Sequence, residues 1–541
     1  MIPQALTSSR LQNAIIGVGS VVVVLFLFGQ NLRAKWWTTD DLEVMTFVGK
    51  EEHLATSKIV PTLLSKTELD PLSRQPRFRP SYYALRVAEA WAWGKNPMLW
   101  YAFHLAFFAS FMMAVWYTAN PLVGFLPAAL LAIYTVTFSS WSDIFARLGA
   151  SEAYATLGLT FTLFGLHAMF RAGKSERGWL LLFVGIVVAA GAKENFIVLL
   201  VPAGIALAAG LHRKTANWAA YLSMSLSLLW CAWIASVVMV RLRNWGGDVY
   251  FNSVEPGNRA ATLLQGLTHT GILPLYGLGI LFLCLWICLR KWNGRAANTA
   301  LFATIGTVLL IGLYLSQVVY YNGDWPRSLP VDWRYNVPGL LCWPLALFLI
   351  LWTARKLSSS LPIVPGSRLA IRRGVFVIRL PAVRVVQASM VLIGLAAVIS
   401  HVGDASVERI ASQSNVRRTT RFTGVIERLA RVAARHPDYP ILVQTNYAWD
   451  YEAVVSYYVF SRAYGVPNEM YLIWIPDEHP SSPWLDHLRA DLARYSEQGW
   501  GDTYLPRPQL NIKGQKCILV VVAGEPEKTC QVEIDGQWRD F

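Results

Sequence analysis

"NAIIGVGSVVVVLFLFGQNL", residues 13–32, is an uninterrupted apolar run near the start of the chain. A helix of about 20 such residues is long enough to cross the hydrocarbon core of a bilayer. No small-residue cleavage site accompanies the run, so we expect a retained membrane helix and not a cleaved signal peptide. "WWTTDD" follows at residues 36–41, which places Asp40 and Asp41 where this helix leaves the membrane.

The composition of the whole chain agrees with a polytopic membrane protein. Of its 541 residues, 54% are hydrophobic and 15% are charged, and the mean hydropathy is +0.36. A soluble protein of this length needs more polar residues to cover its surface. The net charge of +14 resides between apolar segments, where membrane topology explains it, so no nucleic-acid partner is expected.

Further apolar runs predict about eleven membrane helices. Basic residues follow the fourth, sixth and eighth runs, and the segment 355–384 holds seven basic residues and no acidic one. These loops lie on one side if every run crosses, and lysine and arginine mark that side as cytoplasmic. The runs lie near residues 13–32, 97–118, 121–138, 153–170, 178–192, 196–211, 218–240, 271–289, 298–320, 336–353 and 385–402.

The opposite side carries most of the acidic residues of the membrane region, mixed with tryptophan and tyrosine. Its largest loop is 36–96. Charges gathered on one face of a membrane protein mark a site more often than a boundary. The candidates are Asp40 and Asp41, "RFRPSYY" (77–83) with Arg79, Tyr82 and Tyr83, Asp143 and Glu152 around Arg147, Lys193 and Glu194, and "DWRYNVP" (332–338) with Arg334 and Tyr335.

Residues 403–541 have the composition of a soluble domain. Amphipathic patterns such as "FTGVIERLARVAARH", "DYEAVVSYYVFSRAYG" and "WLDHLRADLARYSEQG" predict helices, and "YPILVQTN", "MYLIWIP", "KCILVVVAG" and "CQVEID" predict strands. This alternation indicates a small α/β domain. The topology places it outside the cytoplasm, where Cys517 and Cys530 are expected to form a disulfide.

In order and position, these motifs resemble the GT-C superfamily of integral membrane glycosyltransferases. The acidic pair after the first helix is similar to the family's "DE" or "DD" signature, and "RFRPSYY" to its "KPPLYY" type of segment. "GAKENFIVLLVP" is similar to the "KE" turn of several branches, and "WRYNVPGLLCWPLAL" to their "RY..PalP" helix. The resemblance covers roughly residues 36–350. Arginine stands where the protein-mannosyl and aminoarabinosyl branches often have lysine, and the C-terminal region matches no branch.

The resemblance implies a GT-C-like catalytic module over residues 1–402 that uses a polyprenyl-phosphate-linked sugar. An inverting transfer needs a base for the acceptor hydroxyl, and a carboxylate can serve. Cationic groups stabilise the departing phosphate where water is scarce. By similarity to the family, Asp40 is the base. Neighbours in an extended segment point opposite ways, so Asp41 would orient a substrate, hold a cation or pair with a basic residue.

The remaining roles are expected as follows. Arg79, Lys193, Arg334 and Tyr335 would bind the donor phosphate, and Tyr82, Tyr83, Asp143, Glu152 and Glu194 would contact substrate. No metal site is expected, no cofactor is certain, and a divalent cation stays open. Some of these residues fit structural roles equally well. Lys193 and Glu194 can form an ion pair, and Arg147 can form salt bridges with Asp143 and Glu152.

The expected partners are the donor lipid, membrane lipids and an extracytoplasmic glycan, lipid or protein acceptor such as a pilin, at a bacterial inner membrane. The sugar stays open among arabinofuranose-like, aminoarabinose, mannose and glucose donors. The alternative is a transporter or flippase for sugars or polyprenyl lipids, whose charges would line a pathway. The sequence shows no internal repeat of the kind many transporters have. A non-catalytic sensor would not need so many charged residues in its outer loops.

Overall fold

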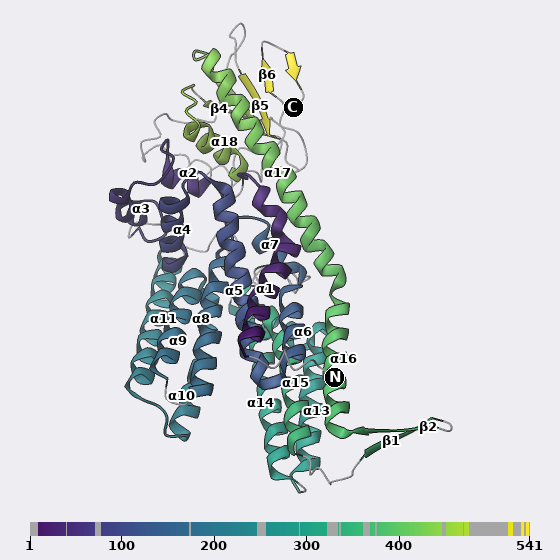
Figure 1. The fold of residues 1–541 in the computed structure, drawn as a ribbon. Coiled ribbons are helices and arrows are strands. Elements are labelled where there is room, and N and C mark those ends of the chain that lie inside the picture. The colour runs from purple at the N-terminus through teal and green to yellow at the C-terminus, as the bar shows by residue number, and fades with distance from the viewer. Residues whose placement is uncertain are drawn as a thin grey trace.

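Long helices dominate the computed structural model of the chain (Figure 1). The structure describes residues 9–38, 40–70, 77–172, 175–245, 256–291, 293–321, 334, 337–360, 368–373, 376–445, 451–468, 470–474, 518–522, 532–534 and 537–539.

Each of the eleven apolar runs forms a helix. A one-sided helical pattern is absent from most of these runs because their residues face either lipid or neighbouring helices. The helices are α1 (Ser9–Phe28), α5 (Pro97–Val123), α6 (Phe125–Val136), α8 (Ser151–Ala172), α9 (Glu176–Ala192), α10 (Leu200–His212), α11 (Trp218–Trp245), α13 (Leu273–Leu289), α14 (Gly294–Tyr321), α15 (Cys342–Ser360) and α16 (Ala382–Ser400).

By length and composition, seven described helices could each cross a membrane, or up to nine spans if each of two bent pairs counts as one. One pair is α6 with the helical turns η4 (Ser139–Trp141) and α7 (Ser142–Phe145), bent by 55°. The other is α16 with α17 (Val402–Arg435), bent by 43°. Helices α8 and α9 are not among the candidate spans, so the expected number of eleven exceeds what length and hydropathy support.

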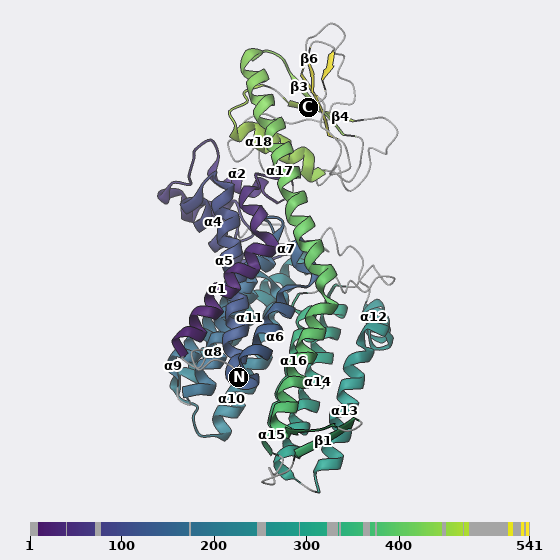
Figure 2. The ribbon, with the colours of Figure 1, turned by 45° about the vertical axis from the view of Figure 1, so that its right-hand side comes forward.

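Helices α8 and α9 form a tight antiparallel hairpin. A Cβ atom on Gly158 would lie 2.5 Å from the backbone nitrogen of Ala189, and one on Gly165 would lie 2.7 Å from the carbonyl oxygen of Gly178. Small residues let membrane helices approach this closely. The pair lies alongside the spanning helices (Figures 1 and 2). An antiparallel pair adds either two membrane crossings or none. The side of the membrane on which every other segment lies is therefore the same whether or not α8 and α9 cross.

Short helices cover one end of the helix bundle. They are η2 (Gly29–Arg33), α2 (Leu42–Val48), η3 (Thr56–Lys58), α3 (Ile59–Ser65) and α4 (Pro80–Trp93), together with η4, α7 and η5 (Glu194–Leu199). The other short helices are α12 (Pro256–Thr268), η6 (Thr270–Ile272) and η8 (Gly339–Leu341). The same end of the bundle faces the C-terminal strands, whereas the hairpin of β1 (Arg368–Arg373) and β2 (Phe376–Pro381) lies at the opposite end (Figure 1).

The C-terminal part contains a five-stranded mixed sheet in the order β4-β3-β5-β6-β7. The central strand β3 pairs in parallel with β4 and β5, and β5–β6 and β6–β7 are antiparallel. The strands are β3 (Ile441–Thr445), β4 (Met470–Trp474), β5 (Ile518–Val522), β6 (Val532–Ile534) and β7 (Gln537–Arg539), and helix α18 (Tyr451–Ala463) lies between β3 and β4 in the chain. The helix predicted from "WLDHLRADLARYSEQG" lies outside the described residues.

Helix α17 departs from the expectation that its helix begins near Phe422. It begins at Val402, directly after the C-terminal end of α16, and runs for 34 residues up to the sheet (Figure 2). Its buried apolar residues, from Phe422 to Ala433, belong to the same apolar cluster as those of α1, α5 and α8. Its first half looks polar in the sequence because it buries Glu408, Ser412 and Asn415, residue types that hydropathy counts as surface residues.

Candidate active site

Asp40 lies in a turn between η2 and α2. Its φ angle is 63°, in the left-handed region that residues other than glycine seldom adopt. Arg86 of α4, which is fully buried, donates hydrogen bonds of 2.8 Å to the carbonyl oxygens of Asp40 and Leu148. A neighbouring charged group thus fixes the strained backbone, which is how such conformations persist at functional sites.

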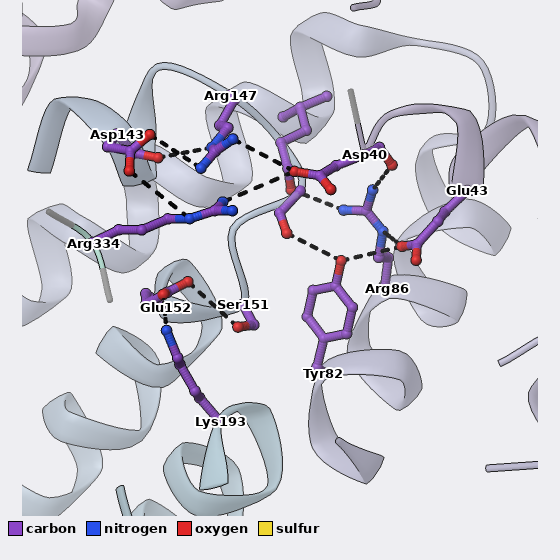
Figure 3. Close-up of polar contacts among 12 residues, drawn as sticks. Asp40, Glu43, Tyr82, Arg86, Asp143, Arg147, Ser151, Glu152, Lys193 and Arg334 are labelled. Atoms are coloured by element: carbon purple, nitrogen blue, oxygen red, sulfur yellow. Dashed lines mark hydrogen bonds and ion pairs between the residues drawn. The ribbon is translucent and has the colours of Figure 1, made fainter. Parts of the chain in front are cut away.

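Two carboxylates and two guanidinium groups face one another at this turn (Figure 3). Oδ2 of Asp40 lies 3.7 Å from Nη1 of Arg147 and 3.9 Å from Nη1 of Arg334. The same two arginines lie 3.0 and 3.8 Å from the carboxylate of Asp143. The side chain of Asp40 stays 30% exposed and that of Asp143 42%. The cluster can therefore be reached by a substrate.

The electrostatics of the cluster keep Asp40 ionised. Burial would raise the pKa of this carboxyl, but the charges of Arg147 and then Arg334 outweigh it, so the pKa is lowered from its ordinary value. An ionised carboxylate between arginines accepts a proton readily only after those cations are engaged elsewhere.

Asp41 has a different environment from its neighbour. Its side chain is fully buried, and Oδ2 accepts a 2.8 Å hydrogen bond from the backbone N–H of Trp37. Burial raises the pKa of this carboxyl to about 8, so it is mostly protonated at neutral pH. The expected contact with substrate does not fit this position. The side chains of Asp40 and Asp41 do diverge, but the cause is a left-handed turn and not the extended segment that the sequence suggested.

The remaining charged candidates form two pairs across the chain. Arg79, at the start of α4, lies 3.6 Å from Glu194, and both side chains are about 15% exposed. Lys193 forms an ion pair and hydrogen bond with Glu152, and both are almost fully buried. Lys193 therefore pairs with Glu152 and Arg79 with Glu194, so the expected alternatives Lys193–Glu194 and Arg147 with Glu152 are not the pairings found. The expected alternative of Arg147 with Asp143 is found, at 3.0 Å.

Tyr82 and Tyr83 are held by Glu43. Each hydroxyl lies 3.2 Å from a carboxylate oxygen of Glu43, and Tyr82 also donates to the carbonyl oxygen of Gly149 over 3.2 Å. Nε of Arg86 completes the group at 3.1 Å from Glu43. The two tyrosines are nearly buried, so their contacts are with the protein.

Sequence reasoning missed Glu43 and Arg86. Arg86 lies four and three residues after Tyr82 and Tyr83 on one helix, a spacing that places the three side chains on neighbouring parts of one face. A charged residue on that face of a mostly apolar helix was the available signal. Glu43 gave none, because its partners lie about forty residues away in the chain.

Three of the expected residues, Tyr335, Cys517 and Cys530, lie outside the described residues. Among those described, Cys231, Cys284, Cys288 and Cys342 are free thiols. In the same portion of the chain, no three His, Cys, Asp or Glu side chains are grouped as metal ligands would be. Beside Asp40, the positive charge that a cation would contribute comes from Arg147 and Arg334.

No family profile matches the chain, and no curated protein matches it. The solved structures similar to it include two of ArnT from Cupriavidus metallidurans, one bound to undecaprenyl phosphate and one in the apo state. Each has 11% sequence identity and a TM-score of 0.38. The first comparison covers 94% of this chain and 92% of that structure, and the second covers 95% and 93%.

Proposed function

We propose that this protein is an inverting glycosyltransferase of the GT-C type, which moves a monosaccharide from a polyprenyl-phosphate carrier to an extracytoplasmic acceptor. The single observation that carries the proposal is the contact of Asp40 with both Arg147 and Arg334 at one end of the membrane helices. That arrangement supplies a carboxylate for the acceptor hydroxyl and two cations for a phosphate.

In the proposed reaction, Asp40 removes the proton from the acceptor hydroxyl as its oxygen attacks the anomeric carbon. The bond between that carbon and the phosphate oxygen breaks, and its electron pair leaves with the polyprenyl phosphate. Arg334 and Arg147 neutralise the departing charge. When the donor phosphate engages these arginines, they neutralise Asp40 less, so the pKa of Asp40 rises and it becomes a better base.

Arg79 is the next phosphate ligand in this proposal, because it is partly exposed and its partner Glu194 is 3.6 Å away, beyond ordinary hydrogen-bond distance. Lys193 is assigned a supporting role, since it is buried against Glu152. Asp143 shares both arginines with Asp40 and would restrain them when no donor is bound. Tyr335 stays a proposed phosphate ligand on the family resemblance alone.

The proposal includes the sidedness of the molecule. Asp40 would lie outside the cytoplasm, and the basic loops would lie inside. Residues 403–541 would form an α/β domain that is also outside the cytoplasm, beside the site. Reporter fusions at residues 175 and 410 should report opposite compartments. Two fusions that report the same compartment would contradict this topology. In thiol labelling of unreduced, denatured protein, the proposed Cys517–Cys530 disulfide leaves four reactive cysteines.

The test of function uses the full chain in lipid nanodiscs with polyprenyl-phosphate-linked arabinofuranose, aminoarabinose, mannose and glucose as separate donors. Release of polyprenyl phosphate that depends on an added extracytoplasmic glycan, lipid or pilin acceptor would support transfer and identify the sugar. Mass spectrometry of extracytoplasmic glycans with and without the protein would identify the acceptor. Movement of an intact donor lipid between the leaflets of vesicles, without its cleavage, would instead support the flippase alternative.

A further inference from the structure

The segment between η2 and Asp40 is partly buried and belongs to no helix or strand. Residues 34–37 are irregular, and Ala34 and Trp36 are each 2% exposed. Buried backbone N–H and C=O groups need hydrogen-bond partners, and such a segment has none from regular secondary structure. The N–H of Ala34 bonds to the carbonyl oxygen of Asn31 over 2.9 Å, and the next three N–H groups bond to side chains.

Helix α17 supplies those partners from one face. The hydroxyl of Thr419 accepts the N–H of Lys35 over 2.9 Å, and that of Thr423 accepts the N–H of Trp36 over 3.2 Å. One turn earlier, Asn415 donates to Oδ1 of Asn31 over 3.0 Å. Intervals of four residues place these three side chains in one row along the helix. All three are almost completely buried.

Two serines bond to the main chain on either side of residues 34–37. Ser412, earlier on α17, donates to the carbonyl oxygen of Phe28 at the end of α1 over 3.3 Å. At the other end, Ser456 of α18 donates to the carbonyl oxygen of Thr38. The next N–H, that of Trp37, is taken by Asp41. Three consecutive N–H groups, from Lys35 to Trp37, are thus bound by side chains just before Asp40.

Aromatic packing joins the same two parts of the chain. The ring centroids of Trp37 and Phe422 of α17 lie 6.2 Å apart, and those of Trp36 and Phe460 of α18 lie 6.4 Å apart. These edge and tilted contacts fix the direction of the segment, while the hydrogen bonds fix its register along α17.

We infer that Asn415, Thr419 and Thr423 are positioning residues that set the geometry of Asp40, so that the C-terminal helices form part of the catalytic apparatus. The inference rests on the proposed function for its kinetic consequence. An amphipathic helix that only packed on the membrane region would carry apolar side chains on this face. Hydroxyl groups aimed at main-chain N–H groups instead determine where each residue of the segment lies.

The test variant is the double substitution Thr419→Val and Thr423→Val in the full-length protein. Valine has nearly the shape of threonine but cannot accept the two N–H groups. Displacement of a catalytic group by about 1 Å can cost on the order of 10²-fold in rate, so we expect kcat at saturating donor to fall by roughly 10- to 100-fold. The dissociation constant for the donor lipid should stay near the wild-type value, because Arg79, Arg147 and Arg334 are unchanged.

Two matched variants isolate the hydroxyl groups. Thr420→Val changes an exposed threonine on the same helix and should leave kcat unchanged. Thr419→Ser with Thr423→Ser restores both acceptors and should return kcat toward the wild-type value. A double valine variant that transfers sugar at the wild-type rate would overturn the inference. So would a loss of rate that the serine variant shares, since that loss would report packing.

Hydrogen–deuterium exchange tests the positioning without using activity. In the valine variant, the amides of Lys35 and Trp36 should exchange faster, while peptides from α5 keep their protection. The serine and Thr420→Val variants should resemble wild type. If wild type transfers no sugar but exchange changes as expected, the proposed function fails and the positioning stands. Unchanged exchange at residues 35 and 36 would contradict the positioning itself.

Discussion

The α-carbon of Gly149 lies directly against the side chain of Asp40. A Cβ atom built on Gly149 would come within 1.8 Å of Cβ and 2.5 Å of Oδ2 of Asp40. The loop between α7 and α8 therefore touches the proposed base itself, and at Gly149 it has room for a hydrogen atom only.

Substitution Gly149→Ala should displace the carboxylate of Asp40 from Arg147 and Arg334. A misplaced catalytic group loses on the order of 10²-fold in rate, so the turnover of transfer should fall by about that factor. The matched control is Gly204→Ala, where an added Cβ meets nothing within 4 Å. Steady-state transfer by both purified variants checks this, and equal rates would show that the contact with Asp40 does not matter.

The environment of Asp41 predicts a pH dependence of stability. Burial raises the pKa of this carboxyl to about 8 in the folded protein, against about 3.9 in an unfolded chain. The folded state therefore binds more protons between these values, and the stabilisation present below pH 4 is lost as the pH rises toward 8. Thermal unfolding of wild type should show a falling Tm over this range.

Asp41→Asn removes that titration and keeps an oxygen for the N–H of Trp37. Its Tm should fall less from pH 5 to pH 8 than that of wild type. Asp40→Asn is the control: the pKa of Asp40 is lowered from its ordinary value, so the stability that it contributes is lost only below about pH 4, and from pH 5 to pH 8 the Tm of this variant should fall as much as that of wild type. Parallel curves for wild type and Asp41→Asn would mean that Asp41 is ionised in the folded protein.

Arg334 should influence both the donor and the base. Arg334→Gln removes a cation from the phosphate, so donor binding should weaken by roughly tenfold, as expected for loss of a charge-assisted hydrogen bond. It also removes a charge that lowers the pKa of Asp40, so the acid limb of the kcat/KM profile should move to higher pH. Arg79→Ala should weaken donor binding and turnover without the same shift of the limb.

The control for Arg334→Gln is Arg295→Gln, which changes an exposed arginine at the start of α14. It should leave both donor binding and the pH profile unchanged. An acid limb that does not move in Arg334→Gln would separate this arginine from the titration of Asp40.

The buried pair of Lys193 and Glu152 should behave as a structural unit. Glu152→Gln removes the carboxylate that faces a buried ammonium group, which typically costs about 3–5 kcal/mol of stability. The double variant Glu152→Gln with Lys193→Met should recover much of that loss. A double-mutant cycle of denaturant unfolding checks the coupling, and additive effects would show that the two charges do not interact.

Local sequence patterns predicted the helices well but not the pairings between them. Hydropathy located the eleven apolar helices because lipid demands apolar residues over a continuous length, and short motifs located Asp40, Asp143, Arg79 and Arg334. Arg86 was missed because its bonds to backbone oxygens depend on the fold. The buried position of Asp41 and the early start of α17 at Val402 were missed because a polar residue buried against a main chain looks like a surface residue in sequence.

The central claim is that Asp40 accepts the proton of the acceptor hydroxyl. The most direct measurement is the single-turnover rate of sugar transfer by purified Asp40→Asn protein at saturating donor, beside donor-lipid binding by the same sample. Asparagine keeps the shape but cannot take the proton, so the rate should fall by roughly 10²–10⁴-fold with donor binding retained. Transfer at the wild-type rate by a folded Asp40→Asn variant would contradict the account.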